Sequence, residues 1–246
     1  METLIVGDGG LGRAIAAACR ERGHPAPHVL GRPAGGRHNV ASLRPVDVAF
    51  EATTGSAVLA NVEAILAAGC RRLVIGTTAW EADRGGVDGL LRRSGAAAVA
   101  ASNLSLACAL FVRVVEDAAA RFAALGGFDP YIVEWHRRTK QDRPSGTAGE
   151  LARRMADVSA RVPEISSVRA GANPGTHLVG FDGPGEAVEI RLVARDRVAY
   201  ADGALAAAAW LMAAARRPGL HSFEEVVDDL LAAGPAERAG QVAMAS

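Results

Sequence analysis

The fold is indicated by the stretch Leu4-Ile5-Val6-Gly7-Asp8-Gly9-Gly10-Leu11-Gly12, close to the start of the chain. Its apolar residues predict a buried strand, and residues 13–22 after it have the pattern of a helix. The glycines follow the spacing G-x-G-x-x-G, which permits a tight turn and lets a pyrophosphate approach the N–H groups of a helix N-terminus. Because 28 of 246 residues are glycine, this spacing alone is weak evidence. The flanking strand and helix favour dinucleotide binding over an ordinary strand-to-helix turn. The candidate cofactor ligands here are Gly7, Gly9, Gly10, Leu11 and Gly12.

An acidic residue that binds the adenosine ribose is expected about 20 residues later, and the sequence has none there. The second strand, expected at residues 27–30, is followed by Gly31-Arg32. Arg32 and Arg37 offer positive charge to a 2′-phosphate instead. We therefore expect both NADH and NADPH to bind, and NADPH at least as tightly.

The rest of the first hundred residues alternates between strand and helix patterns. Strands are expected at residues 46–51, 72–76 and 97–101, with helices at 57–68 and 88–93. Short apolar strands separated by helices predict an α/β fold with a Rossmann-type, doubly wound parallel sheet. Gly76-Thr77-Thr78 and Ser102-Asn103 follow two of these strands, where such sheets bind ligands. They are candidates to bind a nicotinamide or a substrate, and Ser102 and Asn103 equally suit helix capping.

The second half has a different pattern. A long helix is expected at residues 105–125, a strand at 131–134 and a helix at 146–160. Extended segments then follow at residues 165–169, 177–181 and 188–193, and the last predicts one buried face with Val188, Ile190 and Leu192. Helices are expected at 203–217 and 223–233. This order predicts a second, α+β domain with an antiparallel or mixed sheet.

The overall composition excludes several classes of protein. Lys and Arg together number 27, as do Asp and Glu, so no net charge attracts nucleic acid or an anionic membrane. Cys19, Cys70 and Cys108 are too few and too scattered for a disulfide framework or a zinc site, so we expect core packing and no metal. The charge-free residues 94–112 fit a short strand, a turn and a helix better than a membrane span. With no signal peptide evident, a cytoplasmic protein is expected.

The densest group of reactive side chains lies in residues 134–148, which read EWHRRTKQDRPSGTA. This segment contains Lys140, the single lysine among 27 basic residues. His136 is suited to proton transfer near neutral pH. The turn Ser145-Gly146-Thr147 leads into a helix whose free N–H groups suit a carboxylate. The alternative is a charged surface loop with a capped helix, and the lysine inside this group favours the site.

The same segment resembles the motif E-x-H-H-x-x-K-x-D-x-P-S-G-T-A of the dihydrodipicolinate (4-hydroxy-tetrahydrodipicolinate) reductase family, which acts in lysine and diaminopimelate biosynthesis. The resemblance extends over nearly the whole chain. Further similar stretches are Gly76-Thr77-Thr78, Asn103-Leu104-Ser105, Gly175-Thr176-His177, Gly185-Glu186, Glu189-Ile190, Arg197 and Ala201-Asp202-Gly203-Ala204.

The resemblance implies hydride transfer from NADH or NADPH to a cyclic, unsaturated dicarboxylate. It implies that His136 donates a proton, that Lys140 binds a carboxylate and assists the acid, and that Ser145, Gly146 and Thr147 bind the other carboxylate. It also implies a nucleotide-binding domain of residues 1–103 and 203–246. Residues 104–202 would then bind substrate and form a homotetramer through their sheet.

Departures from the family pattern leave alternatives open. Arg137 and Arg191 replace family histidines, and Glu51-Ala52-Thr53 replaces D-F-T, so Thr53 remains a candidate cofactor ligand. We expect these changes to lie around the substrate and nicotinamide, and we expect Arg137 to point inward rather than toward solvent and Asp142. Three hypotheses remain: a reductase of dihydrodipicolinate, a divergent paralogue that reduces another cyclic imino acid, and a non-catalytic nucleotide-binding protein.

Overall fold

The structure is a computed structural model that describes residues 1–31 and 46–233. The chain divides into two compact units, Met1–Leu106 with Arg197–Ser246, and Ala107–Asp196. The expected boundaries were residues 103 and 203, so the chain returns to the first unit earlier than expected. No helix in the described parts of the chain is long and apolar enough to cross a membrane.

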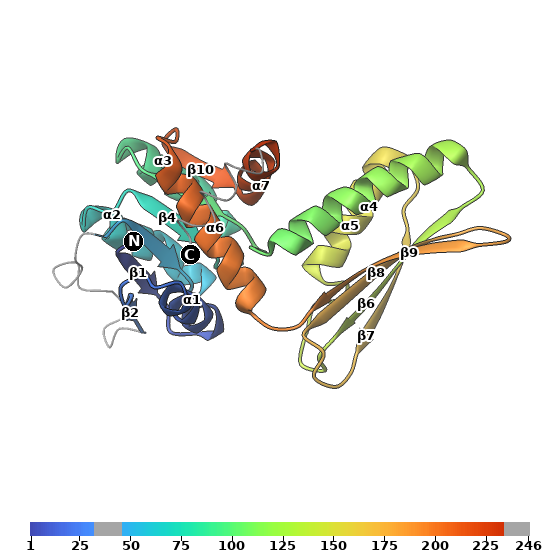
Figure 1. Cartoon of the computed structure of the whole chain (residues 1–246), viewed down its shortest axis with the longest axis horizontal. Coiled ribbons are helices and arrows are strands. Elements are labelled where there is room, and N and C mark those ends of the chain that lie inside the picture. Colours follow the sequence, from blue (N-terminus) through green and yellow to red (C-terminus); the bar gives the residue numbers. More distant parts are fainter. Residues whose placement is uncertain (32–45, 234–246) are drawn as a thin grey trace. The chain divides into compact units, whose positions relative to one another are not determined.

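The first unit is built on a parallel sheet, seen in Figure 1, whose strands have the order β10-β5-β4-β3-β1-β2. The strands are β1 (Thr3–Val6), β2 (His28–Leu30), β3 (Val48–Glu51), β4 (Arg72–Ile75), β5 (Ala97–Ala100) and β10 (Gly219–Ser222). The helices are α1 (Gly10–Glu21), η2 (Gly55–Ala57), α2 (Val58–Ala67), η3 (Glu81–Asp83), α3 (Arg84–Arg93), α6 (Val198–Ala213) and α7 (Phe223–Ala232). All neighbouring strands run parallel, which confirms the Rossmann-type sheet.

Both faces of this sheet are buried, which is why its strands are apolar without alternation. Leu4 and Val6 of β1 pack into a core with α2 and α3, and Ile5 between them is also fully buried. Helices α1 and α6 contact each other. An ion pair of 2.6 Å joins Arg22, which directly follows α1, to Asp202 near the start of α6. Cys19, Cys70 and Cys108 are buried thiols outside any disulfide, as predicted.

Helix α6 and strand β10 differ from the sequence prediction. The helix covers Val198–Ala213 instead of residues 203–217, so Gly203 lies inside it. A Cβ at Gly203 would lie only 1.6 Å from the Leu104 carbonyl oxygen, and the glycine therefore permits close packing rather than starting the helix. Strand β10 was not predicted at all, because Gly219-Leu220-His221-Ser222 has no apolar run.

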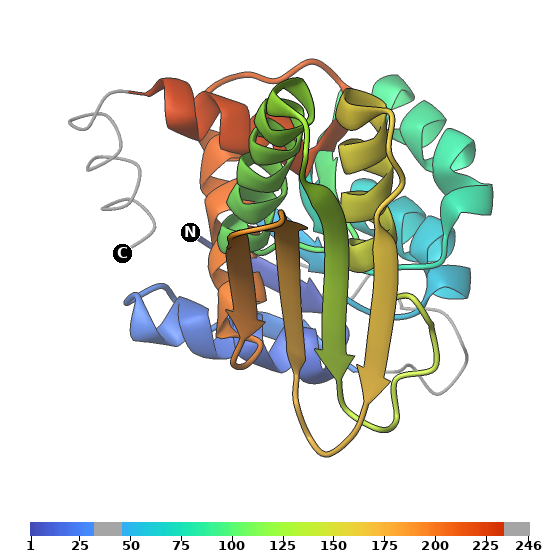
Figure 2. The same cartoon turned by 90° about the vertical axis from the view of Figure 1, so that its right-hand side faces the viewer.

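The second unit is a mixed four-stranded sheet covered on one face by two helices, as Figure 2 shows. The elements are α4 (Leu106–Leu125), β6 (Asp129–His136), α5 (Gly146–Ser159), β7 (Glu164–Arg169), β8 (Gly175–Asp182) and β9 (Ala187–Ala194). The strand order is β7-β6-β8-β9, with β6 and β7 parallel and the other pairs antiparallel. This confirms the α+β prediction.

Alternation along the strands decides which side chains face the helices. Ile132, Val179 and Phe181 are buried against α4 and α5, together with Leu151 and Met155 of α5. The opposite face of the sheet carries exposed apolar side chains, namely Trp135, Val168 and Val193. Ile190 and Leu192 are half-buried as expected, but Val188 is 41% exposed because it lies near the start of an edge strand.

Candidate active site

The glycine loop between β1 and α1 has the geometry that a bound pyrophosphate requires. Gly7 has φ +117°, and a Cβ there would lie 2.2 Å from the Ala52 carbonyl oxygen. A Cβ at Gly12 would lie 1.9 Å from the Gly7 carbonyl oxygen, so this glycine lets α1 approach the strand closely. A Cβ at Gly9 would have nothing within 4 Å, so space is open above this residue. These are the three separate roles of the glycines in dinucleotide-binding loops, and the loop therefore fits the cofactor.

The N-terminal end of α1 is available to an anion. Gly9 is the N-cap residue and provides no side-chain hydrogen bond, so a phosphate would supply the missing acceptor. The guanidinium group of Arg197, an exposed residue, lies 2.9 Å from a Cβ built on Gly10. Leu11 packs over Gly76, whose Cβ would lie 2.6 Å from Leu11 Cδ2. This contact brings the glycine loop beside the loop that follows β4.

Asp8 changes the expectation about cofactor choice. A Cβ built on Gly31 would lie 2.9 Å from Asp8 Oδ2, so this carboxylate lies beside the residue that follows β2. That is where the ribose-binding acid of dinucleotide-binding folds usually lies. The residues directly after β2 contain no acid, as the sequence indicated, but the glycine loop places the carboxylate of Asp8 beside them, so the preference for NADPH stays a prediction. Arg32 and Arg37 lie outside the described residues.

The loops after β3 and β4 are joined by hydrogen bonds. Thr53 N donates to Thr77 Oγ1 at 2.8 Å, and Thr53 Oγ1 donates to the carboxylate of Glu51. Asn61 Nδ2 donates to both Glu51 Oε1, at 3.0 Å, and Thr53 Oγ1, at 3.1 Å. Glu51 is 1% exposed and was missed as a member of this group. It fixes the hydroxyl of Thr53, while Thr78 is exposed.

The loop after β5 contains the remaining cofactor candidates. Asn103 Oδ1 accepts a hydrogen bond from Ser105 N at 2.9 Å, which forms an Asx turn just before α4 begins; the bond is made to a residue outside the helix, so it is not a helix cap. Ser102 is exposed. Both residues follow the carboxyl end of a parallel strand in the same sheet as Gly7, Thr53 and Gly76, at the edge where ligands of such sheets bind.

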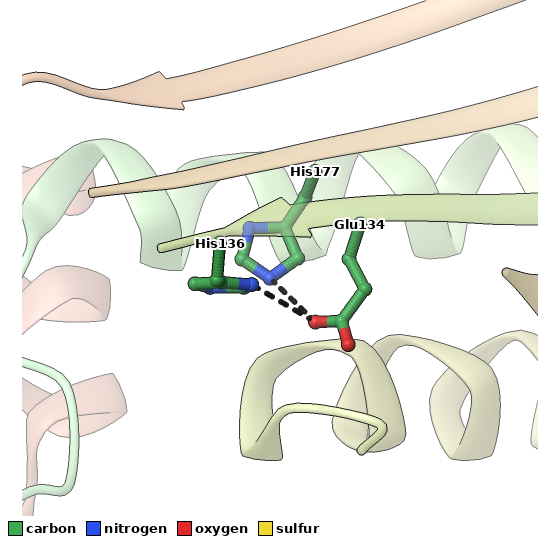
Figure 3. A group of neighbouring side chains, drawn as sticks. All are labelled: Glu134, His136 and His177. Atoms are coloured by element: carbon green, nitrogen blue, oxygen red, sulfur yellow. Dashed lines mark ion pairs between the residues drawn. The ribbon is translucent and has the colours of Figure 1, made fainter. Parts of the chain in front are cut away.

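In the second unit, β6 directs Glu134 and His136 to the helix-covered face. The register of the sheet places Ser167 of β7 and His177 of β8 on either side of Glu134, and Arg169 beside His136. Figure 3 shows both imidazoles facing the same carboxylate oxygen of Glu134. Glu134 Oε2 lies 3.3 Å from His136 Nδ1 and 3.8 Å from His177 Nε2. Of these three residues, only His136 was predicted to have a catalytic role.

The other carboxylate oxygen of Glu134 accepts three hydrogen bonds. The donors to Oε1 are Ser167 Oγ at 2.5 Å, Arg169 Nη2 at 2.7 Å and Ser145 N at 3.0 Å. Burial would raise the pKa of Glu134, but hydrogen bonds from Ser145, Ser167 and Arg169 outweigh it and hold this pKa at about 2. Glu134 is therefore a permanent carboxylate inside the unit.

The two histidines are neutral near pH 7 in the free protein. Burial, together with the neighbouring His136, lowers the pKa of His177 to about 4, and the carboxylate of Glu134 opposes this shift. Burial also lowers the pKa of His136, and again the carboxylate of Glu134 opposes the shift. An anionic ligand beside His136 would raise its pKa and so favour the protonated form that can act as an acid.

The first turn of α5 has features that suit the binding of a carboxylate. Ser145 is the N-cap residue, and its Oγ accepts from Ala148 N at 3.3 Å and lies 3.2 Å from His177 Nε2. The exposed Gly146 has no atom within 4 Å of a built Cβ, and Thr147 is half-buried. Although Ser145, His177 and Glu134 resemble a catalytic triad in composition, both partners of His177 face the same nitrogen, Nε2. The imidazole therefore cannot pass a proton between them as a triad does.

Lys140 and Arg137 occupy the loop between β6 and α5. Lys140 Nζ pairs with Asp142 at 2.8 Å, and its charge is one cause of the lowered pKa of His136. Arg137 is exposed and donates from Nε to Thr139 Oγ1 at 3.2 Å. Arg137 follows the end of β6 at His136, and its expected orientation toward the substrate stays a prediction. Asp142 is paired with Lys140 rather than with Arg137.

Arg191 also lies away from the site. It pairs in register with Leu178, whereas His177 pairs with Leu192, so Arg191 belongs to the opposite face of the sheet from His136. The expectation that this substitution changes the substrate pocket of its own protomer is therefore wrong. Ser167 and Arg169 were missed, and Glu134 was given no role, although polar side chains at alternate positions after the apolar Ile132 were a usable signal for Glu134.

Glu134, His136 and His177 are also a possible metal-ligand group among the described residues, with one atom of each within 4.8 Å of the others. The guanidinium group of Arg169 is bound to the same carboxylate, and this positive charge opposes a cation. The hydrogen-bonding arrangement accounts for these side chains without a metal.

Known proteins are similar to this chain over most of its length. Residues 107–227 match the family model described as dihydrodipicolinate reductase, C-terminus. The 4-hydroxy-tetrahydrodipicolinate reductase of Rhodopseudomonas palustris (strain BisA53) is 34% identical over 269 residues, covering 92% of this chain and 96% of the relative. That of Methanococcoides burtonii is 32% identical over 197 residues, covering 74% of this chain and 73% of the relative.

A solved structure has the same fold. Dipicolinate-bound dihydrodipicolinate reductase from Paenisporosarcina sp. TG-14 matches with a TM-score of 0.68 and 21% identity, covering 90% of this chain and 97% of that one. Together the matches place the protein in the class of NAD(P)H-dependent oxidoreductases. Within that class, the chain belongs to the dihydrodipicolinate reductase family.

Proposed function

We propose that this protein reduces 4-hydroxy-tetrahydrodipicolinate, or a closely related cyclic imino dicarboxylate, with NADH or NADPH. The observation that carries the proposal is the second unit's combination of a buried histidine, a neighbouring lysine and an open first turn of α5. A protein that only binds a carboxylate would use the positive charge of Lys140 and the N-terminus of α5, but it would not need His136 as a proton donor. The retained His136 therefore favours catalysis of reduction.

The proposed chemistry assigns one step to each group. When bound, the cofactor supplies a hydride to the conjugated, unsaturated ring. The reduced ring then takes a proton, which His136 donates while Glu134 stabilises the imidazolium. Lys140 stabilises the negative charge that develops on the ring and its adjacent carboxylate. Ser145, Gly146 and Thr147 would hold the second carboxylate at the first turn of α5, where the helix dipole favours an anion.

The cofactor would be held by the first unit. Gly7, Gly9, Gly10, Leu11 and Gly12 would form the pyrophosphate loop, with Thr53, Gly76, Thr77, Thr78, Ser102 and Asn103 toward the nicotinamide. The support for this is the open space above Gly9 and the shared edge of the sheet. Arg197 would add a positive charge beside the phosphates. Arg32 stays a prediction, as does a cytoplasmic location.

The proposal is tested by following NAD(P)H oxidation with freshly generated 4-hydroxy-tetrahydrodipicolinate beside a panel of cyclic imino acids. We expect turnover with the dicarboxylate, and a kcat about 10²–10⁴-fold lower in the His136→Ala variant, whose binding of cofactor should be normal. Turnover of a monocarboxylate at the same rate would contradict a site built for two carboxylates.

A second candidate substrate is a related imino acid whose carboxylate is placed differently. The observation that favours it is Arg137, which replaces a family histidine and is exposed. If this candidate is right, Arg137→His should raise kcat/KM for 4-hydroxy-tetrahydrodipicolinate tenfold or more, equal to about 1.4 kcal/mol of transition-state binding. Efficient turnover by the parent, with no gain on substitution, would contradict it.

The open face of the second unit's sheet suits self-association. Trp135 of β6, Val168 of β7 and Val193 of β9 leave apolar surface exposed on one face of the sheet, which single chains seldom leave uncovered. A homotetramer formed through this face is therefore part of the proposal. Light scattering should give four copies per particle, and Trp135→Glu should reduce that number.

A further inference from the structure

The carboxylate of Glu134 has two oxygens with different surroundings. Oε1 accepts from Ser145 N, Ser167 Oγ and Arg169 Nη2, whereas Oε2 faces His136 Nδ1 at 3.3 Å. The side chain of Glu134 is fully buried and that of His136 is 8% exposed. Each oxygen therefore acts on a different part of the site, one on the start of α5 and one on the imidazole.

Oε2 and Nδ1 are matched in hydrogen-bonding capacity. Within the described residues, neither of these buried atoms has a hydrogen-bond partner, and they lie 3.3 Å apart, just beyond the usual N–H···O distance. A neutral imidazole carries one N–H, and a carboxylate can only accept. Oε2 can accept a hydrogen bond from Nδ1 only when the proton of neutral His136 is on Nδ1. Nε2 is then the nitrogen that exchanges protons.

We propose that Glu134 is a positioning residue for the reduction: it fixes the tautomer of His136 through one carboxylate oxygen and the start of α5 through the other. The inference rests on the proposed function, in which His136 donates the proton and the first turn of α5 binds a carboxylate. It adds that both groups are held by the same buried side chain. The proton donor and the substrate anchor are thereby set relative to each other.

Room for the imidazole depends on a neighbouring glycine. A Cβ built on Gly175 would lie 3.1 Å from His136 Nε2 and 3.3 Å from its Cδ2. Gly175 thus leaves space beside the nitrogen that the proposal makes the donor. The ring of His177, 5.1 Å from that of His136 and nearly perpendicular to it, limits movement on the other side.

Other charged or titratable groups also change the pKa of His136. A pH effect of Glu134 on the reaction must therefore be separated from the effects of these groups. They come from its own strand, both neighbouring strands and the loop, and they are Glu134, Arg169, His177, Lys140 and Asp142. Glu134 and Asp142 raise the pKa of His136, and Lys140 and Arg169 lower it. Of the two carboxylates, only Glu134 is buried against the ring.

The first experiment substitutes Glu134→Gln in the full chain. The amide oxygen can still accept from Ser145, Ser167 and Arg169, but an NH₂ group then faces Nδ1 and opposes the protonated imidazole. We expect kcat to fall roughly 10–100-fold, as for other residues that orient a reacting histidine. The pH at which the rate is lost on the alkaline side should fall by about one unit, because a close negative charge has been removed.

The KM for NAD(P)H should not change, because the cofactor loop belongs to the first unit. Asp157→Asn is the matched control, since it removes a carboxylate from an exposed ion pair on α5 and should leave kcat and the pH profile unchanged. A Glu134→Gln variant that folds and keeps both the parent kcat and the parent pH profile would overturn the inference.

Glu134→Gln also leaves the buried Arg169 without its counter-charge, so this variant could fail to fold. The second experiment therefore uses the parent protein: long-range ¹H–¹⁵N NMR of histidine-labelled chain, with the signal assigned by His136→Ala. We expect neutral His136 to carry its proton on Nδ1. A proton on Nε2, or a divalent metal bound to Nδ1 in the purified protein, would overturn the inference. Because this measurement needs no substrate, it stands even if the proposed reduction is not observed.

Discussion

Two glycines of the pyrophosphate loop, three residues apart, should respond oppositely to the same substitution. A Cβ at Gly12 would lie 1.9 Å from the Gly7 carbonyl oxygen, and real Cβ atoms essentially never approach within 3.0 Å. The contact is with backbone on both sides, so α1 must move from β1 by about 1 Å. Overpacking of this kind costs about 1–3 kcal/mol, and a rigid backbone contact belongs at the upper end.

Gly9→Ala is the opposite case. Gly9 has φ −71° and ψ −169°, which alanine adopts freely, and its built Cβ has no atom within 4 Å. The unfolding free energy should stay the same or rise by up to about 1 kcal/mol, because alanine reduces the entropy of the unfolded chain. The methyl group would, however, occupy the space proposed for the pyrophosphate. We therefore expect the Kd for NADH and NADPH to rise about tenfold or more.

The two variants are compared by urea unfolding and by calorimetric titration with both cofactors. Gly12→Ala should be destabilised, and Gly9→Ala should be stable but weak in binding. If Gly9→Ala bound both cofactors with the parent Kd, the loop would not be the pyrophosphate site. If Gly12→Ala were as stable as the parent, the close approach of α1 to β1 would not require a glycine at this position.

Three further predictions concern single side chains. His136→Ala and Lys140→Met should each lower kcat about 10²–10⁴-fold with unchanged cofactor Kd; near-normal turnover in either would make the motif structural only. The pKa of His177 is about 4 in the fold against the ordinary 6.5, so the unfolded chain takes up this proton first and stability is lost as the pH falls through this interval. Unfolding free energy should drop by up to roughly 3 kcal/mol between these pH values, and an equal drop in His177→Gln would contradict the assignment. Asp8→Asn should tighten NADPH relative to NADH, measured as a ratio of Kd values; an unchanged ratio would mean that Asp8 does not reach the ribose.

The sequence predicts best where a residue type has one local role. The loop from Gly7 to Gly12 was predicted because its glycines have local roles at a recognisable spacing. Gly7 has a positive φ, Gly12 allows close approach of backbone, and Gly9 leaves space for a ligand. The strands of the first unit were predicted because both faces are buried, which leaves an unbroken apolar run such as Val48–Phe50. Gly203 shows the limit, since its helix packs on Leu104, about a hundred residues away in sequence.

The candidate site was predicted in part for the same reason. His136 and Lys140 are conspicuous by residue type, and Ser145 by its place before a helix. The partners of Glu134 on β7 and β8 are more than thirty residues away along the chain, and only the strand register brings Ser167 and Arg169 beside it. Likewise, the carboxylate of Asp8 was counted with the glycine loop, although the fold places it beside Gly31.

The return of the chain to the first unit has a consequence for the order of folding. Strand β10, at the edge of the parallel sheet, pairs with β5, and α6 packs with α1, so this sheet is completed only by residues made after the whole second unit. The second unit is one continuous segment, Ala107–Asp196, and has all its strands earlier. During synthesis, therefore, the inserted unit can form its core while β5 still has an unpaired edge. That edge, together with the apolar surface that α6 later covers, is where a growing chain is most exposed to wrong pairing with other chains.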